Sequence, residues 1–157
     1  MKIRIYSLFL ALGLSIVCFV IAKPVKATLG ESADSIESDR QVLSALQGPE
    51  SVLIGYTVQE MESYANRVRE YISPGGMVFG IAWNGRVHPA LSQLLGSYEA
   101  EYRAALSRVH RNKGNRRSLQ VKTPDIVVEK WGHMRDLRGR AYVPSLIPSG
   151  VSVDEIK

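Results

Sequence analysis

The hydrophobic positions of this chain form three patterns, and each predicts a different kind of element. An apolar run covers residues 6–22, apolar and polar positions alternate through much of 52–83, and a helical repeat lies between Pro89 and Val109. A long apolar run is typical of a targeting or membrane segment. Strict alternation indicates a half-buried strand, and a spacing of three to four residues indicates an amphipathic helix.

The N-terminal run has the features of an export signal. Lys2 and Arg4 precede it, and Val25-Lys26-Ala27 follows it with small residues at the positions that a signal peptidase reads. We therefore expect residues 1–27 to be a signal peptide and residues 28–157 to form the mature protein. That protein would have no transmembrane span and would be periplasmic or secreted. The alternative is an uncleaved anchor, although the run is at the short end of the ~17–25 residues that a spanning helix needs.

The alternating positions predict an antiparallel sheet of about five strands. Three strands over 52–59, 65–73 and 77–83 would form a meander, and strands over 126–131 and 140–143 would form a C-terminal hairpin. In the segment Ser73-Pro74-Gly75-Gly76, proline takes the second turn position and glycine the third. This order predicts a type II turn with Gly75 at positive φ.

The helical repeat predicts one long helix from Pro89 to about Val109. Its leucines Leu94 and Leu95 are expected to pack on the sheet face that carries Phe79 and Ile81. A capping-box spacing at residues 28–31 predicts a possible N-terminal helix over about 31–46. Together these elements indicate a single α+β domain over 28–157, with an antiparallel sheet and the long helix packed across it.

Charge and cysteine content exclude several functional classes. The formal net charge is +5, but residues 1–27 hold four of the 20 basic residues and none of the 15 acidic ones. The mature chain is therefore nearly neutral, which gives no support for nucleic-acid binding. Because Cys18 is the only cysteine and lies in the signal, a disulfide or a thiol nucleophile is not expected in the mature protein.

Two charged blocks suggest a docking surface. Residues 103–124 hold seven basic residues and no acidic one, whereas residues 28–62 hold seven acidic residues and only Arg40 as a base. An exposed basic block attracts anionic lipid, polysaccharide or an acidic partner. Alternatively, the two blocks face each other, or the basic block is simply a solvated loop. The candidate anion-docking residues are Arg111, Lys113, Arg116 and Arg117.

The segment 131–144 holds the densest set of side chains that could bind a ligand. Arginine forks beside aromatic rings can hold a carboxylate, a phosphate or a sugar. The alternative is a hairpin turn with solvated charges and packed aromatics. The candidate binding residues are Trp131, His133, Arg135, Arg138, Arg140 and Tyr142.

No catalytic, metal or cofactor motif is present. His88, His110 and His133 are far apart, without the spacing of a metal site, and no Gly-x-Ser-x-Gly elbow occurs. The sequence therefore favours a non-enzymatic module that binds or assembles with an envelope protein or an anionic surface. The alternative is an envelope hydrolase that uses His133 and Asp136.

Several motifs in combination resemble a known family. The chain resembles small exported bacterial proteins grouped as domain of unknown function 2844, from about Thr28 to Lys157. The resemblance implies bacterial export and one domain, and it supplies no activity, cofactor or catalytic residue. The motifs are Arg69-Glu70-Tyr71-Ile72-Ser73-Pro74-Gly75-Gly76-Met77-Val78-Phe79-Gly80-Ile81-Ala82-Trp83, Leu94-Leu95-Gly96-Ser97-Tyr98, Gly132-His133-Met134-Arg135 and Gly139-Arg140-Ala141-Tyr142-Val143-Pro144.

Overall fold

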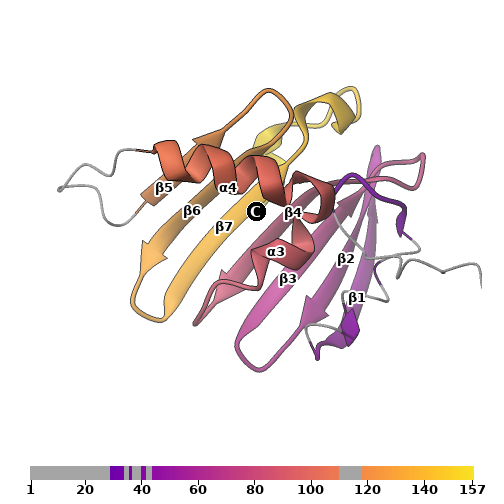
Figure 1. Ribbon diagram of the computed structural model, residues 1–157. Coiled ribbons are helices and arrows are strands. Elements are labelled where there is room, and N and C mark those ends of the chain that lie inside the picture. The colour runs from indigo at the N-terminus through magenta and orange to yellow at the C-terminus, as the bar shows by residue number, and fades with distance from the viewer. Residues whose placement is uncertain (1–28, 34–35, 37–39, 42–43, 110–117) are drawn as a thin grey trace, which may run out of the picture.

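The dominant element is one antiparallel sheet of seven strands, with the spatial order β1-β2-β3-β4-β7-β6-β5 (Figure 1). The computed structural model describes residues 29–33, 36, 40–41, 44–109 and 118–157. The prediction of about five strands was wrong. The strands are β1 (Leu46–Leu53), β2 (Tyr56–Glu62), β3 (Asn66–Ile72), β4 (Val78–Gly85), β5 (Ser118–Lys122), β6 (Val127–His133) and β7 (Asp136–Tyr142).

The predicted long helix is also wrong, because the segment is broken into three short pieces. Helix α3 (Leu91–Leu94) is followed by the 3-10 turn η2 (Gly96–Tyr98) and by helix α4 (Glu99–Arg108). Gly96 has φ +48°, a left-handed conformation that an α-helix does not continue through. All three pieces lie across one face of the sheet (Figure 1), which we call the helix face. We call the opposite face the back face.

The first hairpin lies inside the segment predicted as a single strand over 52–59. Strands β1 and β2 pair with Leu53 opposite Tyr56, and the turn uses Ile54, which is 99% exposed, and Gly55 at φ +89°. The apolar alternation runs through this turn, so periodicity alone could not reveal it. Strand β1 begins at Leu46, and the register shifts between Gln47 and Glu50, at Gly48-Pro49. An edge strand tolerates this proline because its outer N–H positions are not paired.

The turn between β3 and β4 has a different glycine in the left-handed region from the one predicted. The N–H of Gly76 donates to the carbonyl of Ser73 at 2.9 Å, which makes Pro74 and Gly75 the two central residues. Positive φ occurs at Gly76 (+76°) and not at Gly75. This is the geometry of a type I turn followed by a left-handed residue, a common three-residue hairpin connection. The type II prediction was wrong.

Each face of the sheet carries its own hydrophobic core. On the helix face, Leu94 and Leu95 are fully buried with Ile81 and Trp83. On the back face, Phe79 packs with Tyr56 and Tyr71, with ring centroids about 6 Å apart. The pairing of β3 with β4 shifts between Tyr71 and Ile72, opposite Phe79. This bulge turns Phe79 away from the helices, contrary to the prediction that it shares their face.

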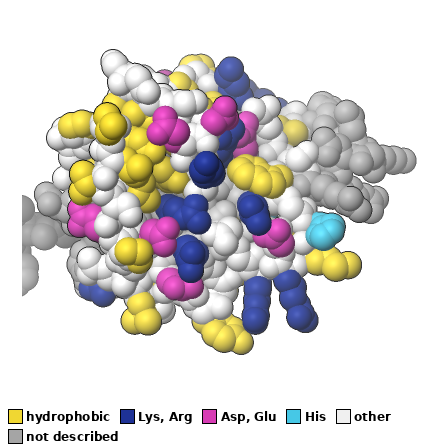
Figure 2. All heavy atoms as spheres, turned by 180° about the vertical axis from the view of Figure 1, so that it is seen from behind, with side chains coloured by type: hydrophobic (Ala, Val, Ile, Leu, Met, Phe, Trp, Pro, Cys, Tyr) yellow, Lys and Arg dark blue, Asp and Glu magenta, His cyan; other side chains and the backbone are white. Residues whose placement is uncertain are grey.

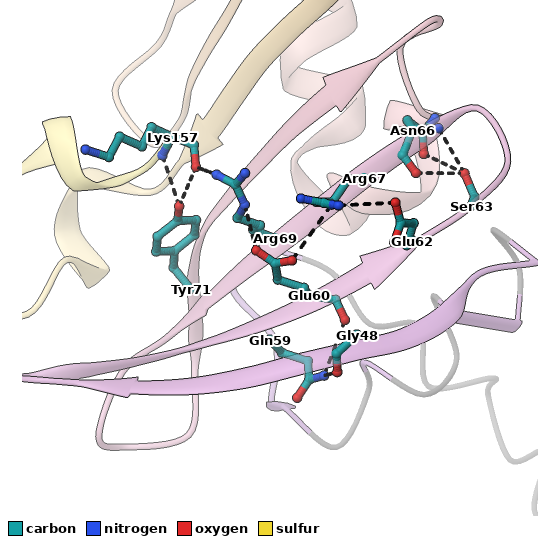
Figure 3. Close-up of polar contacts among 10 residues, drawn as sticks. All are labelled: Gly48, Gln59, Glu60, Glu62, Ser63, Asn66, Arg67, Arg69, Tyr71 and Lys157. Atoms are coloured by element: carbon teal, nitrogen blue, oxygen red, sulfur yellow. Dashed lines mark hydrogen bonds and ion pairs between the residues drawn. The ribbon is translucent and has the colours of Figure 1, made fainter.

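The C-terminal residues Ser152–Lys157, here called the strap, cover part of the back face. Ile156 is fully buried among the aromatic residues of the back-face core. The hydroxyl of Tyr56 donates to Glu155 at 2.8 Å, and the hydroxyl of Tyr71 both donates to the main-chain oxygen of Lys157 at 2.8 Å and accepts from its N–H at 3.0 Å. Figure 3 shows Tyr71 and Arg69 converging on Lys157. A 3-10 turn, η3 (Pro144–Leu146), leads toward the strap, and another, η4 (Val153–Glu155), lies within it.

The tyrosine contacts shift the pKa values of the strap groups. Burial, followed by the hydrogen bond to Glu155, raises the pKa of Tyr56 to about 12. The N–H of Ser152 and then the Tyr56 hydroxyl lower the pKa of the Glu155 carboxyl. Both shifts favour the state in which a neutral phenol donates to an ionised carboxylate.

The predicted N-terminal helix over about 31–46 falls largely outside the described residues. Three described residues within it, Ile36, Arg40 and Gln41, are helical. At its ends the structure differs, because Ser32 forms an isolated bridge with Met77 and Leu46 begins β1. The predicted signal peptide over 1–27 lies outside the described residues. Among the helices that the structure does describe, none has the length and apolarity needed to cross a membrane.

Candidate functional site

The register of the sheet arranges the side chains of the back face in rows that cross six strands. Side chains of directly paired residues point to the same face, so each row can be followed from β5 to β2. The first row is Lys122, Val127, Tyr142, Gly80, Tyr71 and Val58; the second is Gln120, Glu129, Arg140, Ala82, Arg69 and Glu60; the third is Ser118, Trp131, Arg138, Asn84, Arg67 and Glu62.

The first row is mostly apolar, and the strap lies over its centre. Ile156 packs against Gly80, where a β-carbon would lie 2.9 Å from the Ile156 Cδ1 atom. Tyr71 and Val58 are buried in the same core. The strap therefore closes the apolar part of the back face and leaves the two polar rows beyond it.

The second row is a chain of hydrogen bonds centred on Glu129. The Gln120 amide donates to Oε1 of Glu129 at 2.6 Å, and Nε of Arg140 donates to Oε2 at 2.5 Å. At the far end of the row, Arg69 donates to Glu60 at 3.0 Å (Figure 3). The charges of this row are therefore compensated within the row.

The third row is the most open of the three. Arg138 pairs with Asp136 at 3.0 Å and Arg67 pairs with Glu62 at 3.2 Å, and all four side chains are 42% or more exposed. The hydrogen bond that Arg138 donates to Asp136, followed by the negative charge of that carboxylate, raises the pKa of the Arg138 guanidinium. Trp131 lies between Ser118 and Arg138 in this row and is 36% exposed. Figure 2 shows Lys, Arg, Asp and Glu side chains interspersed over the back face, without a region of one sign.

A shallow groove of about 560 Å³ lies between the open end of these rows and the strap. Its walls include Ser118, Gln120 and Glu129 together with Trp131, Arg140 and Ile156. The accessible apolar surface of Trp131 thus lies beside donors and acceptors from β5, β6 and β7. This combination of an apolar contact area and a few placed polar groups is typical of binding sites.

The structure places four of the six predicted binding residues together and two apart from them. Trp131, Arg138, Arg140 and Tyr142 share the back face, and the guanidinium of Arg140 lies 5.9 Å from the ring centroid of Tyr142. His133 and Arg135 lie where β6 turns into β7, beyond the groove. The turn is tighter than predicted, since only Met134, at φ +52°, and Arg135 separate the strands.

Arg140 holds the strap as well as lining the groove. Its Nη1 donates to the main-chain oxygen of Val153 at 2.8 Å and contacts that of Ile156 at 3.5 Å. Its side chain is only 18% exposed. Arg140 is therefore mainly a positioning residue that joins β7, Glu129 and the strap.

Sequence reasoning missed the residues that complete the groove. Gln120 and Ser118 belong to β5, which lies within the polar and basic stretch and lacks clear alternation. Glu129 lies in a predicted strand, two residues before Trp131, and is not among the predicted binding residues. Only the pairing of β5 with β6 brings Ser118 and Gln120 beside Trp131, and no local signal in the sequence specifies that pairing.

The other predicted functional groups, namely the anion-docking residues, the pair His133 and Asp136, and a metal site, do not form a site among the described residues. The anion-docking candidates Arg111, Lys113, Arg116 and Arg117 lie outside the described residues. His133 and Asp136 are paired positions in the hairpin, but the Asp136 carboxylate is bound by Arg138. Among the described residues, no group of three or more His, Cys, Asp or Glu side chains could hold a metal ion.

A second surface carries exposed apolar side chains. Val52 is 80% exposed, Leu53 47% and Ile54 99%, where the edge strand β1 turns into β2. Tyr64, 93% exposed, lies at the other end of β2, in the turn before β3. An edge strand with apolar side chains is a surface on which chains can associate. Strand β1 lies at the opposite edge of the sheet from β5 (Figure 1), which contributes to the groove.

Comparison with known proteins identifies the family of the chain. Neither the curated proteins nor the solved structures contain a match to it. A family model described as "Protein of unknown function (DUF2844)" matches residues 25–156, which agrees with the resemblance of the sequence motifs. The chain belongs to this family.

Proposed function

We propose that the protein is an exported, non-enzymatic module of the bacterial envelope that binds its ligand in the back-face groove. The observation that carries this proposal is the arrangement around Trp131. The charged groups beside it are paired with one another, while the indole remains accessible at the groove wall. Such a surface offers contacts and leaves no unpaired base or nucleophile beside the indole.

The export part of the proposal rests on the sequence of residues 1–27. A positive start, an apolar run and a small-residue site indicate cleavage before Thr28. The intact mass of the protein recovered from the periplasm or the medium should match residues 28–157. A full-length product in the membrane fraction would contradict export by signal cleavage.

Binding in the groove can be tested by thermal stability against ligands of several classes. A ligand that binds only the folded state raises the midpoint of unfolding, by a free energy of about 2.7 kcal/mol at a hundredfold excess over Kd. We expect at least one class among oligosaccharides, lipid headgroups and peptides to stabilise the wild type and not Trp131→Ala. If no class does so, the groove is not the binding site.

The hydrolase alternative has its own test. Chromogenic esters, phosphates, glycosides and peptides should show no turnover above the background of a mock purification. Turnover that is lost in both His133→Ala and Asp136→Ala would contradict the non-enzymatic proposal. Because neither residue lies on the groove wall, these two variants should keep the Trp131-dependent stabilisation.

A further inference from the structure

Building on the proposed function, we propose that the groove binds a neutral carbohydrate chain, with Trp131 as the ring against which a sugar packs. The sequence left three ligand chemistries open for these arginines, namely carboxylate, phosphate and sugar. The contacts on the back face distinguish between them.

The first argument is the accessibility of one tryptophan. Trp83 is 3% exposed and belongs to the helix-face core, whereas Trp131 is 36% exposed and lines the groove. A large aromatic ring offers an apolar face with a negative potential and polar groups at its edge. The C–H face of a pyranose matches such a surface, while its hydroxyl groups point outward to neighbouring side chains.

The second argument is that the arginines near Trp131 already have anionic partners. Arg140 is bonded to Glu129 and Arg138 is bonded to Asp136. The Nζ atom of Lys130 lies 5.4 Å from the ring centroid of Tyr102, on the helix face, so its charge does not point into the groove. The ammonium of Lys157, which also lines the groove, interacts with the charge of the Glu155 carboxylate. A phosphate or carboxylate beside Trp131 would therefore have to compete with carboxylates that belong to the protein, which disfavours an anionic ligand.

The third argument is the hydrogen-bonding capacity of the walls. On the walls, Gln120 has both donors and acceptors and Glu129 has acceptors. Just beyond the walls, the guanidinium of Arg138, which is paired with Trp131, has donors that its two contacts with Asp136 do not use. A hydroxyl group both donates and accepts, so a sugar can add to this network without breaking its ion pairs. The planar side chains lie one strand apart, at about 4.8 Å spacing, and would contact successive hydroxyl groups.

The fourth argument is the shape of the groove. It is open and bounded by the side chains of three strands and by the strap, whereas sites for small metabolites enclose most of their ligand. The backbone groups of β6 and β7 are paired with their neighbours, so the face offers side chains and no strand edge at Trp131. An extended chain lying across the strands fits these features better than an enclosed metabolite.

The probes for the test are linear hexasaccharides of glucose and of N-acetylglucosamine. Binding would be measured by calorimetry and by the fluorescence change of the exposed tryptophan. For the hexasaccharide that binds, Trp131→Ala should weaken the affinity about tenfold or more, as for an aromatic side chain at the centre of a contact, and Trp131→Phe should weaken it less. Tyr64→Ala removes an exposed aromatic in the turn between β2 and β3; it is the matched control and should bind as the wild type does.

Salt dependence separates the proposal from its alternatives. Binding of a neutral chain should be nearly unchanged between 0.1 M and 1 M salt, over which the Debye length falls from ~10 Å to ~3 Å. The anionic arms are inorganic phosphate, heparin and vesicles of phosphatidylglycerol. If one of these binds in a salt-sensitive and Trp131-dependent manner while both hexasaccharides fail, the carbohydrate proposal is overturned and the binding module stands. If no probe or peptide shows Trp131-dependent binding, both the carbohydrate proposal and the proposed binding function of the groove are overturned.

Discussion

Ile156 packs directly on Gly80, so that a β-carbon at position 80 would lie 2.9 Å from the Cδ1 atom of Ile156. Only glycine gives this approach of the strap to the middle of β4. On one side of Ile156, Tyr71 and Arg69 donate to the main-chain oxygen of Lys157. On the other side, Arg140 donates to the main-chain oxygen of Val153. The strap is therefore an integral layer of the back-face core.

The first prediction is that Ile156→Ala destabilises the protein by about 2–5 kcal/mol, the usual cost of truncating a fully buried isoleucine. The free energy of unfolding from urea denaturation measures it. Val87→Ala, at a half-exposed position, should change stability by less than about 0.5 kcal/mol. If Ile156→Ala behaves like Val87→Ala, the strap is not packed on Gly80 in solution.

The second prediction concerns the turn between β3 and β4. Gly76→Val should cost about 1–2 kcal/mol, because a β-branched residue is unfavourable at φ +76°. Apart from the neighbouring residues in the chain, no described atom lies within 4 Å of the β-carbon site, so this cost is mainly conformational. Gly75→Val is the matched control and should cost less, since Gly75 has no positive φ. Equal losses in urea denaturation would contradict the turn geometry.

These two glycines also show how far the sequence could predict the fold. Pro74 and the glycines located the hairpin correctly, because turn chemistry is local. Whether the left-handed residue is Gly75 or Gly76 depends on the register of β3 against β4, which is a long-range property. The same bulge at Tyr71 moved Phe79 to the back face, against the simple alternation.

The candidate site was predictable only in part, for the same reason. Trp131, Arg138, Arg140 and Tyr142 alternate along two adjacent strands, so their common face follows from the hairpin. Gln120 and Ser118 join them only through β5, whose short and polar sequence resembles a loop. The prediction of one long helix was wrong because the apolar stripe continues past Gly96. Such a stripe indicates which residues are buried, and it does not indicate whether the helix backbone is continuous.

The third prediction concerns the helix face. Leu95, between α3 and η2, is fully buried in the helix-face core, with 0% of its surface exposed to solvent. Leu95→Ala should lower the free energy of unfolding by about 2–5 kcal/mol. Val52→Ala, 80% exposed on β1, should lower it by less than about 0.5 kcal/mol. A small loss for Leu95→Ala would mean that the broken helix does not pack on the sheet.

The last prediction concerns pH and rests on a hydrogen bond between Trp83 and His88. The indole N–H of Trp83 donates to Nδ1 of His88 at 2.9 Å, which requires this nitrogen to be unprotonated. Burial, and then the positive charge of Lys130, lower the pKa of His88 below its usual 6.5. The unfolded state therefore binds the proton more readily than the folded state, and stability rises with pH in this range.

The contribution of His88 is thus complete above the unfolded pKa of about 6.5 and is lost as the pH falls below it, toward and through the lower folded pKa. His88→Asn keeps an acceptor near the indole and removes the titration. We expect the free energy of unfolding to fall less in His88→Asn than in the wild type between about pH 7.5 and pH 5, with His133→Asn as the control for loss of a histidine elsewhere. Parallel pH profiles for the wild type and His88→Asn would show that the bond to Trp83 does not depend on the protonation of His88.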